Sequence, residues 1–203
     1  MSTALRRPKA VTKQLGDAKP SNAFTSLDSL LTVPQWAAMA DTKPRYELIA
    51  GKLVQRMTTN TAHAWATGEF LFMCKEWGRA AGWTFLPEGT GVRIDEYTAY
   101  VPDVVGFAPE FVLDPKANYN ERPFLVVEVL SKSTSKKDRT DKLRDYARAG
   151  VPLYVIINTA TRTVEIYGLQ GDAYGAPAVL HENEAWQPAE LPGLRLDPAR
   201  LWI

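Results

Sequence analysis

The stretch FLVVEVLSKSTSKKDRTDKLRDYARAGVPLYVIIN, residues 124–158, decides the fold class. Its apolar run over 124–130 predicts a strand, and its last apolar run, 153–158, predicts a second strand. Between them, residues 136–149 have helical spacing and end at Gly150, a typical helix C-terminal glycine. A strand, a helix and a strand with short connections are typical of a parallel crossover unit. The segment therefore predicts an α/β protein with a mixed β-sheet.

Weaker patterns on both sides add helices and strands to this unit. LTVPQWAAMA predicts a short helix with Thr32 as its N-cap, and RYELIAGKLVQRM predicts a hairpin that turns at Ala50-Gly51. Apolar spacing predicts a helix over 61–81 that ends at Gly82. We expect further strands near residues 83–86, 92–94, 100–107, 162–167, 179 and 194, and a loop over 109–123.

Composition and charge divide the chain into a tail and a body. The 203 residues are 45% hydrophobic, enough for one core, so we expect a single domain over 25–203. Residues 1–24 are polar, and their five basic residues against Asp17 alone give +4, which predicts a disordered basic tail. The remaining 19 basic and 22 acidic residues give the body a charge of −3. That sign does not favour a general phosphate-binding surface.

Several classes of protein are excluded or disfavoured. Cys74 is the only cysteine, so an intrachain disulfide and a four-cysteine zinc site are excluded. No apolar run approaches the ~20 residues that span a bilayer, and no apolar segment follows the N-terminal charges as in a secretory signal. We expect a cytoplasmic protein with no membrane partner.

Two acidic residues stand within apolar strands. Alternation places Glu128 on one strand face with Phe124, Val126 and Leu130. In YVPDVVGF it places Asp103 on a face with Val101, Val105 and Phe107. A buried carboxylate needs a cation, a hydrogen-bonding partner or water. A divalent ion, Mg²⁺ or Mn²⁺, would satisfy both acids at once, while ion pairs at the strand ends are the alternative.

The order of VPDVV, LVVEVLS and DRTDKLRDYARAGVPLYVIIN resembles the Uma-two family of bacterial proteins, described as restriction endonucleases. RYELIAGKLVQRM and the helix with His63 extend the resemblance over roughly residues 30–168. It implies a restriction-endonuclease-like mixed β-sheet flanked by helices, the fold of the PD-(D/E)xK nucleases. It also implies that Pro102-Asp103 is the PD element and Glu128 the second acid, with the Val129 carbonyl as a further metal ligand.

The lysine of the PD-(D/E)xK pattern is displaced in this chain. Leu130 stands at the expected position, and the resemblance implies that Lys142, on the following helix, replaces it. Helical geometry permits this, because Lys142 lies at the edge of the apolar stripe of Leu143 and Tyr146. Lys132 is the rival, and a surface lysine that pairs with Asp138 or Asp145 is the structural alternative.

The resemblance implies roles for two further residues. Glu47 matches an N-terminal acid that completes the metal site or orients a water, although a solvent-facing acid is the alternative. His63 matches a family histidine near a helix start, where it would contact DNA, cap the helix or lie at the core edge.

One basic cluster lies in the body, at the start of the predicted helix. Basic side chains beside an acidic site are suited to a phosphate backbone, and a solvated charged turn is the alternative. The candidate DNA-binding residues of this cluster are Lys132, Lys136, Lys137 and Arg139.

Together these features predict a metal-dependent endonuclease that hydrolyses DNA, with Asp103, Glu128, Lys142 and Glu47 as catalytic residues. DNA is the expected partner, and a homodimer is left open. A catalytically inactive nuclease-like binding or regulatory module is the main alternative. A metal-dependent enzyme that acts on another phosphoester is a third.

Overall fold

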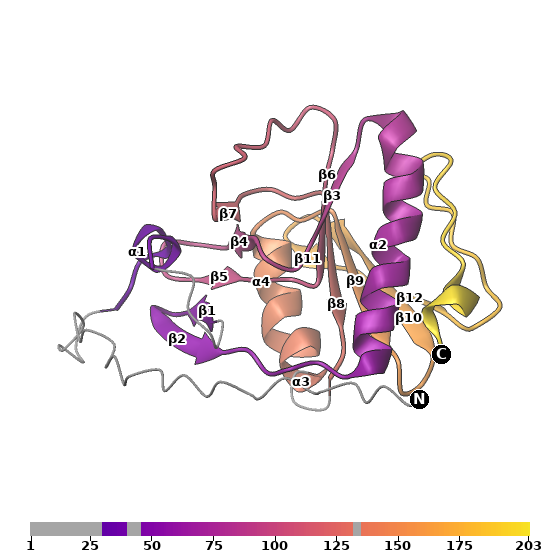
Figure 1. Ribbon diagram of the computed structural model, residues 1–203, viewed down its shortest axis with the longest axis horizontal. Coiled ribbons are helices and arrows are strands. Elements are labelled where there is room, and N and C mark those ends of the chain that lie inside the picture. Colours follow the sequence, from indigo (N-terminus) through magenta and orange to yellow (C-terminus); the bar gives the residue numbers. More distant parts are fainter. Residues whose placement is uncertain (1–29, 40–45, 132–134) are drawn as a thin grey trace, which may run out of the picture.

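The computed structural model describes residues 30–39, 46–131 and 135–203. Within these ranges the strands form a larger and a smaller sheet (Figure 1). The larger sheet has the order β11-β10-β9-β8-β6-β3, and β12 also pairs with β10. Its strands are β3 (Thr84–Pro87), β6 (Val104–Phe107), β8 (Leu125–Val129), β9 (Leu153–Asn158), β10 (Thr163–Gln170), β11 (Ala173–Tyr174) and β12 (Ala178–Leu180).

The smaller sheet has the order β2-β1-β5-β4-β7. Its strands are β1 (Tyr46–Ile49), β2 (Lys52–Gln55), β4 (Gly91–Arg93), β5 (Ala99–Tyr100) and β7 (Tyr119–Asn120). Helix α1 (Val33–Ala37) packs on this sheet through the buried cluster of Val33, Leu48 and Ala99. Strands β1 and β2 form the predicted hairpin, which turns through Ala50 and Gly51, both with positive φ.

The crossover unit forms as the sequence predicts. Strands β8 and β9 pair in parallel, with Leu125 opposite Leu153 and Val129 opposite Ile157. Every residue of β8 is buried, because the strand is covered on both faces, as is typical of parallel pairs. The mixed sheet with flanking helices confirms the expected fold class.

Helices cover the two faces of the larger sheet (Figure 1). Helix α2 (Thr61–Ala81) buries Phe70 and Met73 against one face, where Val127 of β8 belongs to the same cluster. Helix α4 (Leu143–Arg148) buries Tyr146 against the other, beside Val126. Glu128 shares the face of Val126, so its side chain lies on the α4 side. The short 3-10 helix η2 (Pro198–Leu201) is the last helical element.

The predicted helix over 136–149 is divided into three pieces. It consists of a single turn α3 (Ser135–Lys137), a π-helical turn η1 (Asp138–Lys142) and α4, before Gly150 with φ 75°. A π-turn carries one extra residue and is frequent at functional sites. Here it ends at Lys142.

Two sequence predictions are wrong in detail. The single strand expected near 100–107 is two strands, β5 and β6, that belong to different sheets. Pro102 lies at the break, where its missing N–H cannot extend a ladder. The pairing with β8 nevertheless continues one residue beyond β6 to Asp103, whose N–H donates to the Val127 carbonyl. The loop expected over 109–123 contains β7, which pairs in parallel with β4.

No helix in the described part of the chain is both long and apolar enough to cross a membrane.

Candidate active site

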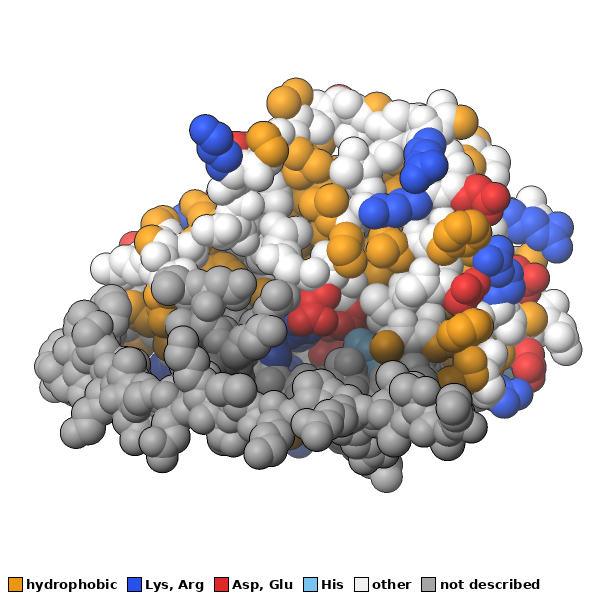
Figure 2. Space-filling view, in the orientation of Figure 1, with side chains coloured by type: hydrophobic (Ala, Val, Ile, Leu, Met, Phe, Trp, Pro, Cys, Tyr) orange, Lys and Arg blue, Asp and Glu red, His pale blue; other side chains and the backbone are white. Residues whose placement is uncertain are grey.

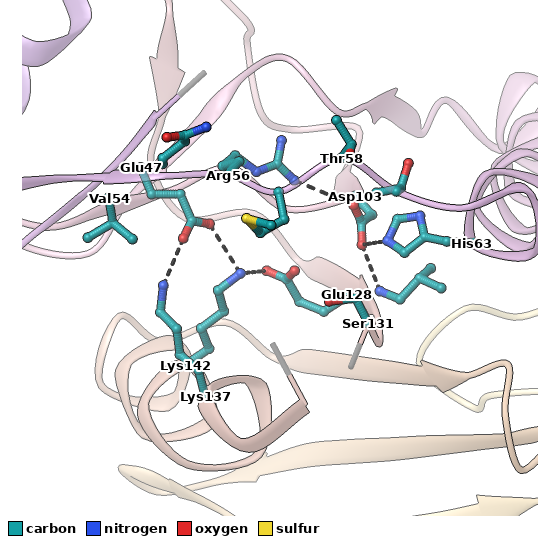
Figure 3. A pocket seen from close by; sticks show the side chains of 14 residues that line it. Glu47, Val54, Arg56, Thr58, His63, Asp103, Glu128, Ser131, Lys137 and Lys142 are labelled. Atoms are coloured by element: carbon teal, nitrogen blue, oxygen red, sulfur yellow. Dashed lines mark hydrogen bonds and ion pairs between the residues drawn. The ribbon is translucent and has the colours of Figure 1, made fainter. Parts of the chain in front are cut away.

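A cleft of about 170 Å³ lies between the β1–β2 hairpin, the start of α2, the ends of β6 and β8, and the helical turn η1. Figure 2 shows acidic, basic and histidine side chains together in a hollow on this face. The charged residues and histidine that line it are Glu47, Arg56, His63, Asp103, Glu128, Lys137 and Lys142 (Figure 3). Segments far apart in sequence therefore contribute to one site.

Asp103 and Glu128 reach the cleft from neighbouring strands. The antiparallel ladder of β6 and β8 pairs Val104 with Val127, so the next position places Asp103 opposite Glu128. The N–H of Asp103 donates to the Val127 carbonyl at 3.1 Å, which continues the pairing beyond β6. Both acids are buried, at 3% and 4% exposed. The structure thus brings together the two acids that the sequence singles out.

Asp103 is held by three contacts. Its Oδ2 accepts a hydrogen bond from the Val129 N–H at 2.7 Å, and His63 Nε2 lies 3.2 Å from the same oxygen. Its Oδ1 lies 3.5 Å from a guanidinium nitrogen of Arg56. The His63 backbone N–H in turn donates to the side chain of Asn60, the N-cap of α2. The helix start therefore fixes the histidine beside Asp103.

Glu128 is buried against a lysine and a tyrosine. Its Oε1 accepts from Lys142 Nζ at 2.7 Å and from the Tyr146 hydroxyl at 2.9 Å. Burial, together with the carboxylates of Asp138, Asp103 and Glu47, raises the pKa of Glu128 to about 8, against the lowering effect of the Lys142 charge. The Glu128 carboxyl would therefore need a further positive charge nearby to lose its proton near neutral pH.

Lys142 lies at the centre of the acidic groups (Figure 3). Its Nζ is 2.7 Å from Glu128, 3.1 Å from Glu47 and 3.5 Å from Asp138. Burial alone would lower its pKa, but the charges of Glu128 and Glu47 outweigh burial and raise it. Lys142 is therefore a buried, permanently charged ammonium group. The alternative of an exposed surface lysine is wrong, although Asp138 is one of its partners.

Glu47 faces the cleft, not solvent. It is 5% exposed, and its Oε2 accepts from Lys137 Nζ at 2.8 Å. Its Oε1 accepts from the Val101 N–H at 3.2 Å. Burial would raise its pKa, but the charges of Lys142 and Lys137 lower it to about 2. Glu47 is thus a fixed negative charge beside Lys142.

Comparison with known proteins identifies the family. The sequence model of the Uma2 (Uma-two) family, described as "Putative restriction endonuclease", matches residues 31–199. The chain belongs to the Uma2 family. None of the curated proteins compared with it matches.

Solved structures agree with the Uma2 assignment at the level of the fold. One is a crystal structure from Anabaena variabilis described as a "putative nuclease belonging to DUF820". It is 18% identical, superposes with a TM-score of 0.71, and the match covers 84% of this chain and 97% of that chain. At that identity the likeness shows a common fold.

The basic cluster predicted for this Uma2 member does not form one surface among the described residues. Lys137 points into the cleft toward Glu47, and Arg139 pairs with Glu165 on β10. Lys136 is exposed. Lys132 lies outside the described residues.

The sequence did not indicate the positions of two charged groups at or beside the cleft. Arg56 follows directly after β2, and no motif marks it. Asp138 is 1% exposed, whereas the sequence suggested a pairing on the helix surface. The π-turn provides the reason, since its extra residue changes which side chains face the sheet. No periodic pattern in the sequence predicts the positions of Arg56 and Asp138.

Hard oxygen atoms of the cleft are suited to a Mg²⁺ or Mn²⁺ ion. In the described ranges, no group of three or more His, Cys, Asp and Glu side chains is arranged to hold a metal. Mg²⁺, however, commonly uses one or two carboxylates and keeps several waters. Among the described residues, both hydrogen-bond partners of Glu128 are on Oε1, and the contact of Asp103 Oδ1 is the 3.5 Å one with Arg56. One oxygen of each carboxylate thus remains for a metal.

Proposed function

We propose that this Uma2 member is a metal-dependent endonuclease that hydrolyses phosphodiester bonds of DNA. One observation carries the proposal: Asp103 and Glu128 stand opposite each other on adjacent strands in a cleft where the Lys142 ammonium lies 2.7 Å from Glu128. Two carboxylates and a lysine in one cleft are the groups needed to bind a metal and stabilise a phosphoryl transition state. Membership of the family supports the same chemistry.

Asp103, Glu128 and the Val129 carbonyl would hold Mg²⁺ or Mn²⁺. The bound ion would polarise the phosphodiester and lower the pKa of a coordinated water. Asp103 is oriented for this role by the Val129 N–H and by His63. We assign His63 primarily to this orientation, since it is 6% exposed, in place of the predicted direct contact with DNA.

Lys142 would orient the attacking water or stabilise charge on the phosphate. Its ammonium group stays protonated because Glu128 and Glu47 surround it. Glu47 would hold this ammonium in place from the hairpin, at 3.1 Å. Lys136, which is exposed, would contact phosphates that position a duplex. A homodimer that cuts both strands remains part of the proposal.

Cleavage of plasmid DNA tests the proposal. The wild type should nick or linearise plasmid in Mg²⁺ or Mn²⁺ and lose activity in EDTA. Asp103→Asn and Lys142→Ala should each lower the rate at least 100-fold, since each removes a group that stabilises the transition state. Lys132→Ala should only weaken DNA binding modestly. Cleavage that persists in Asp103→Asn, or activity lost in Lys132→Ala and kept in Lys142→Ala, would contradict these assignments.

A nuclease-like binding module is the second candidate. The observation that favours it is that Lys142 already lies within ion-pair distance of both Glu128 and Glu47 without a metal. A wild type that binds no Mn²⁺ in calorimetry and never cuts DNA would support this alternative.

A further inference from the structure

Arg56 enters the cleft from the wall opposite the lysines. It follows β2, whereas Lys137 and Lys142 come from the helical turn below (Figure 3). Its side chain is 16% exposed, so the guanidinium lies within the cleft and not on the outer surface. The cleft thus has cations on two sides.

Most of the hydrogen-bonding capacity of Arg56 is unused. One guanidinium nitrogen donates to Glu88, and the other terminal nitrogen lies 3.5 Å from Asp103 Oδ1. A guanidinium has five N–H donors in a planar fork that matches the oxygens of a phosphate. Within the described residues, its remaining donors have no protein partner. They are available to an oxyanion in the cleft.

The two cleft lysines are less suited to this task. Lys142 lies among three carboxylates with its side chain 4% exposed, and Lys137 donates to Glu47. Only Arg56 among these three cations contacts Asp103, the acid assigned to the metal. A phosphate bound beside Asp103 would therefore meet the guanidinium first.

We propose that Arg56 is a phosphate-binding residue that contacts the non-bridging oxygens of the scissile phosphodiester beside Asp103. The phosphodiester substrate rests on the proposed function, while anion binding by Arg56 does not. Before substrate binds, Glu88, which is outside the cleft lining, accepts a hydrogen bond from the guanidinium. When phosphate enters, Glu88 loses this hydrogen bond or shares the guanidinium with the phosphate.

The charge of Arg56 is secure in this environment. Burial would lower its pKa, but the carboxylates of Glu88, Glu128 and Asp103 raise it. The guanidinium is therefore positively charged at neutral pH.

Salt-dependent DNA binding tests the contact without cleavage. Wild type, Arg56→Gln and Arg93→Gln are titrated with a duplex in Ca²⁺ at several salt concentrations. Arg93 is a matched control, because it is also ion-paired, to Glu121, but lies outside the cleft. Loss of one phosphate contact should reduce the slope of log K against log salt by about 1 in Arg56→Gln and leave it unchanged in Arg93→Gln. Equal slopes in all three proteins would overturn the inference.

Glu88→Gln separates phosphate binding from a structural role. If Arg56 served only to tie Glu88 to Asp103, Glu88→Gln and Arg56→Gln would weaken DNA binding equally. A phosphate-binding Arg56 predicts that Glu88→Gln binds DNA as well as or better than wild type, because a competing anion is removed. Arg56→Lys should restore part of the affinity, since it keeps the charge and loses the fork.

Inorganic phosphate and cleavage distinguish this inference from the proposed function. Phosphate should perturb the NMR signals of cleft residues in wild type and Arg93→Gln but not in Arg56→Gln. In Mg²⁺, Arg56→Gln should cleave plasmid about 100-fold more slowly than wild type. Phosphate binding that depends on Arg56, in a protein that never cleaves, would refute only the nuclease assignment. A wild type that binds neither phosphate nor DNA would refute the role of Arg56.

Discussion

Four buried carboxylates share the cleft region with a small number of cations. The acids are Glu47, Asp103, Glu128 and Asp138. Opposite effects act on two of them, because two lysines lower the pKa of Glu47 to about 2 while burial raises that of Glu128 to about 8. One acid is therefore a permanent charge, and the other exchanges its proton near neutral pH. This contrast predicts how stability and metal binding depend on pH.

Replacing Glu128 should stabilise the protein at alkaline pH. The folded state holds the Glu128 proton up to about pH 8, whereas an unfolded glutamate releases it near 4.5. The contribution of Glu128 to the free energy of unfolding is therefore fully present below about pH 4.5 and is lost as the pH rises through 8. Glu128→Gln resembles the protonated acid, so at pH 8.5 it should raise the Tm by several degrees. Thermal unfolding followed by circular dichroism measures this.

Glu47 provides the matched control for that experiment. Its pKa is lowered, so its contribution is present above pH 4.5 and lost as pH falls toward 2. Glu47→Gln should lower the Tm at pH 7, the opposite sign to Glu128→Gln at pH 8.5. A decrease in Tm for Glu128→Gln at pH 8.5 would contradict the raised pKa.

Lys142 and Lys137 should differ in their effect on stability. Lys142→Met leaves buried carboxylates without their shared cation and should cost about 3–5 kcal/mol in the free energy of unfolding. The Lys137 side chain is 26% exposed, and Glu47 is its ion-pair partner among the described residues, so Lys137→Met should cost about 1 kcal/mol or less. Urea unfolding at pH 7 compares the two variants. Equal losses would show that Lys142 is not the main counter-ion of the cluster.

At the scale of elements, a hairpin and a π-turn bring the distant charges to the strand ends. The β1–β2 hairpin carries Glu47 on one strand and Arg56 after the other, so its turn sets their spacing. The π-turn η1 ends at Lys142, and α4 then continues with Tyr146 one turn further along. Lys142 and Tyr146 thereby reach the same oxygen of Glu128.

The hairpin turn can be improved by a single substitution. Ala50 is exposed and has φ 47°, a left-handed conformation. Alanine is strained in this conformation, whereas asparagine adopts it more readily. Ala50→Asn should stabilise the protein by about 0.5–1 kcal/mol. Ala80→Asn, an exposed site within α2, should instead destabilise it, because asparagine is a poorer helix former than alanine. Chemical unfolding of both variants checks the sign.

At the scale of the whole molecule, the cleft lies where the two sheets meet. Asp103 and Glu128 lie at the ends of two neighbouring inner strands of the larger sheet, while Glu47 and Arg56 come from the smaller one. The chain passes between the sheets at Val101-Pro102-Asp103, the segment that carries the first acid. Relative position of the sheets therefore controls the site as much as any single side chain.

The tail over 1–24 should be dispensable for folding. It lies outside the described residues, and the family match begins at residue 31. Its few apolar residues cannot contribute a substantial core. The sequence predicts that the body is a single domain over 25–203. Deleting residues 1–24 should therefore change the Tm by less than about 2 °C. A large decrease would show that the tail packs on the body.

The sequence by itself determined the crossover unit, the α/β class and the presence of two acidic residues within apolar strands. Local periodicity and terminating glycines such as Gly82 and Gly150 carry that information, because helix and strand periods depend on near neighbours. Glu128 stands out for the same reason, as one charge within an apolar strand. The family resemblance added Lys142 and Glu47, which the periodicity alone left open between the site and the surface.

Only the tertiary structure decided which other charges face those acids. Arg56 enters the cleft, Asp138 is buried beside Lys142, Glu47 turns inward, and the predicted strand over 100–107 breaks between two sheets. These outcomes depend on strand pairing and helix packing between residues tens of positions apart, such as Lys142 with Glu47. Buried charges must find partners wherever the fold brings them, and no local pattern records which partner that is.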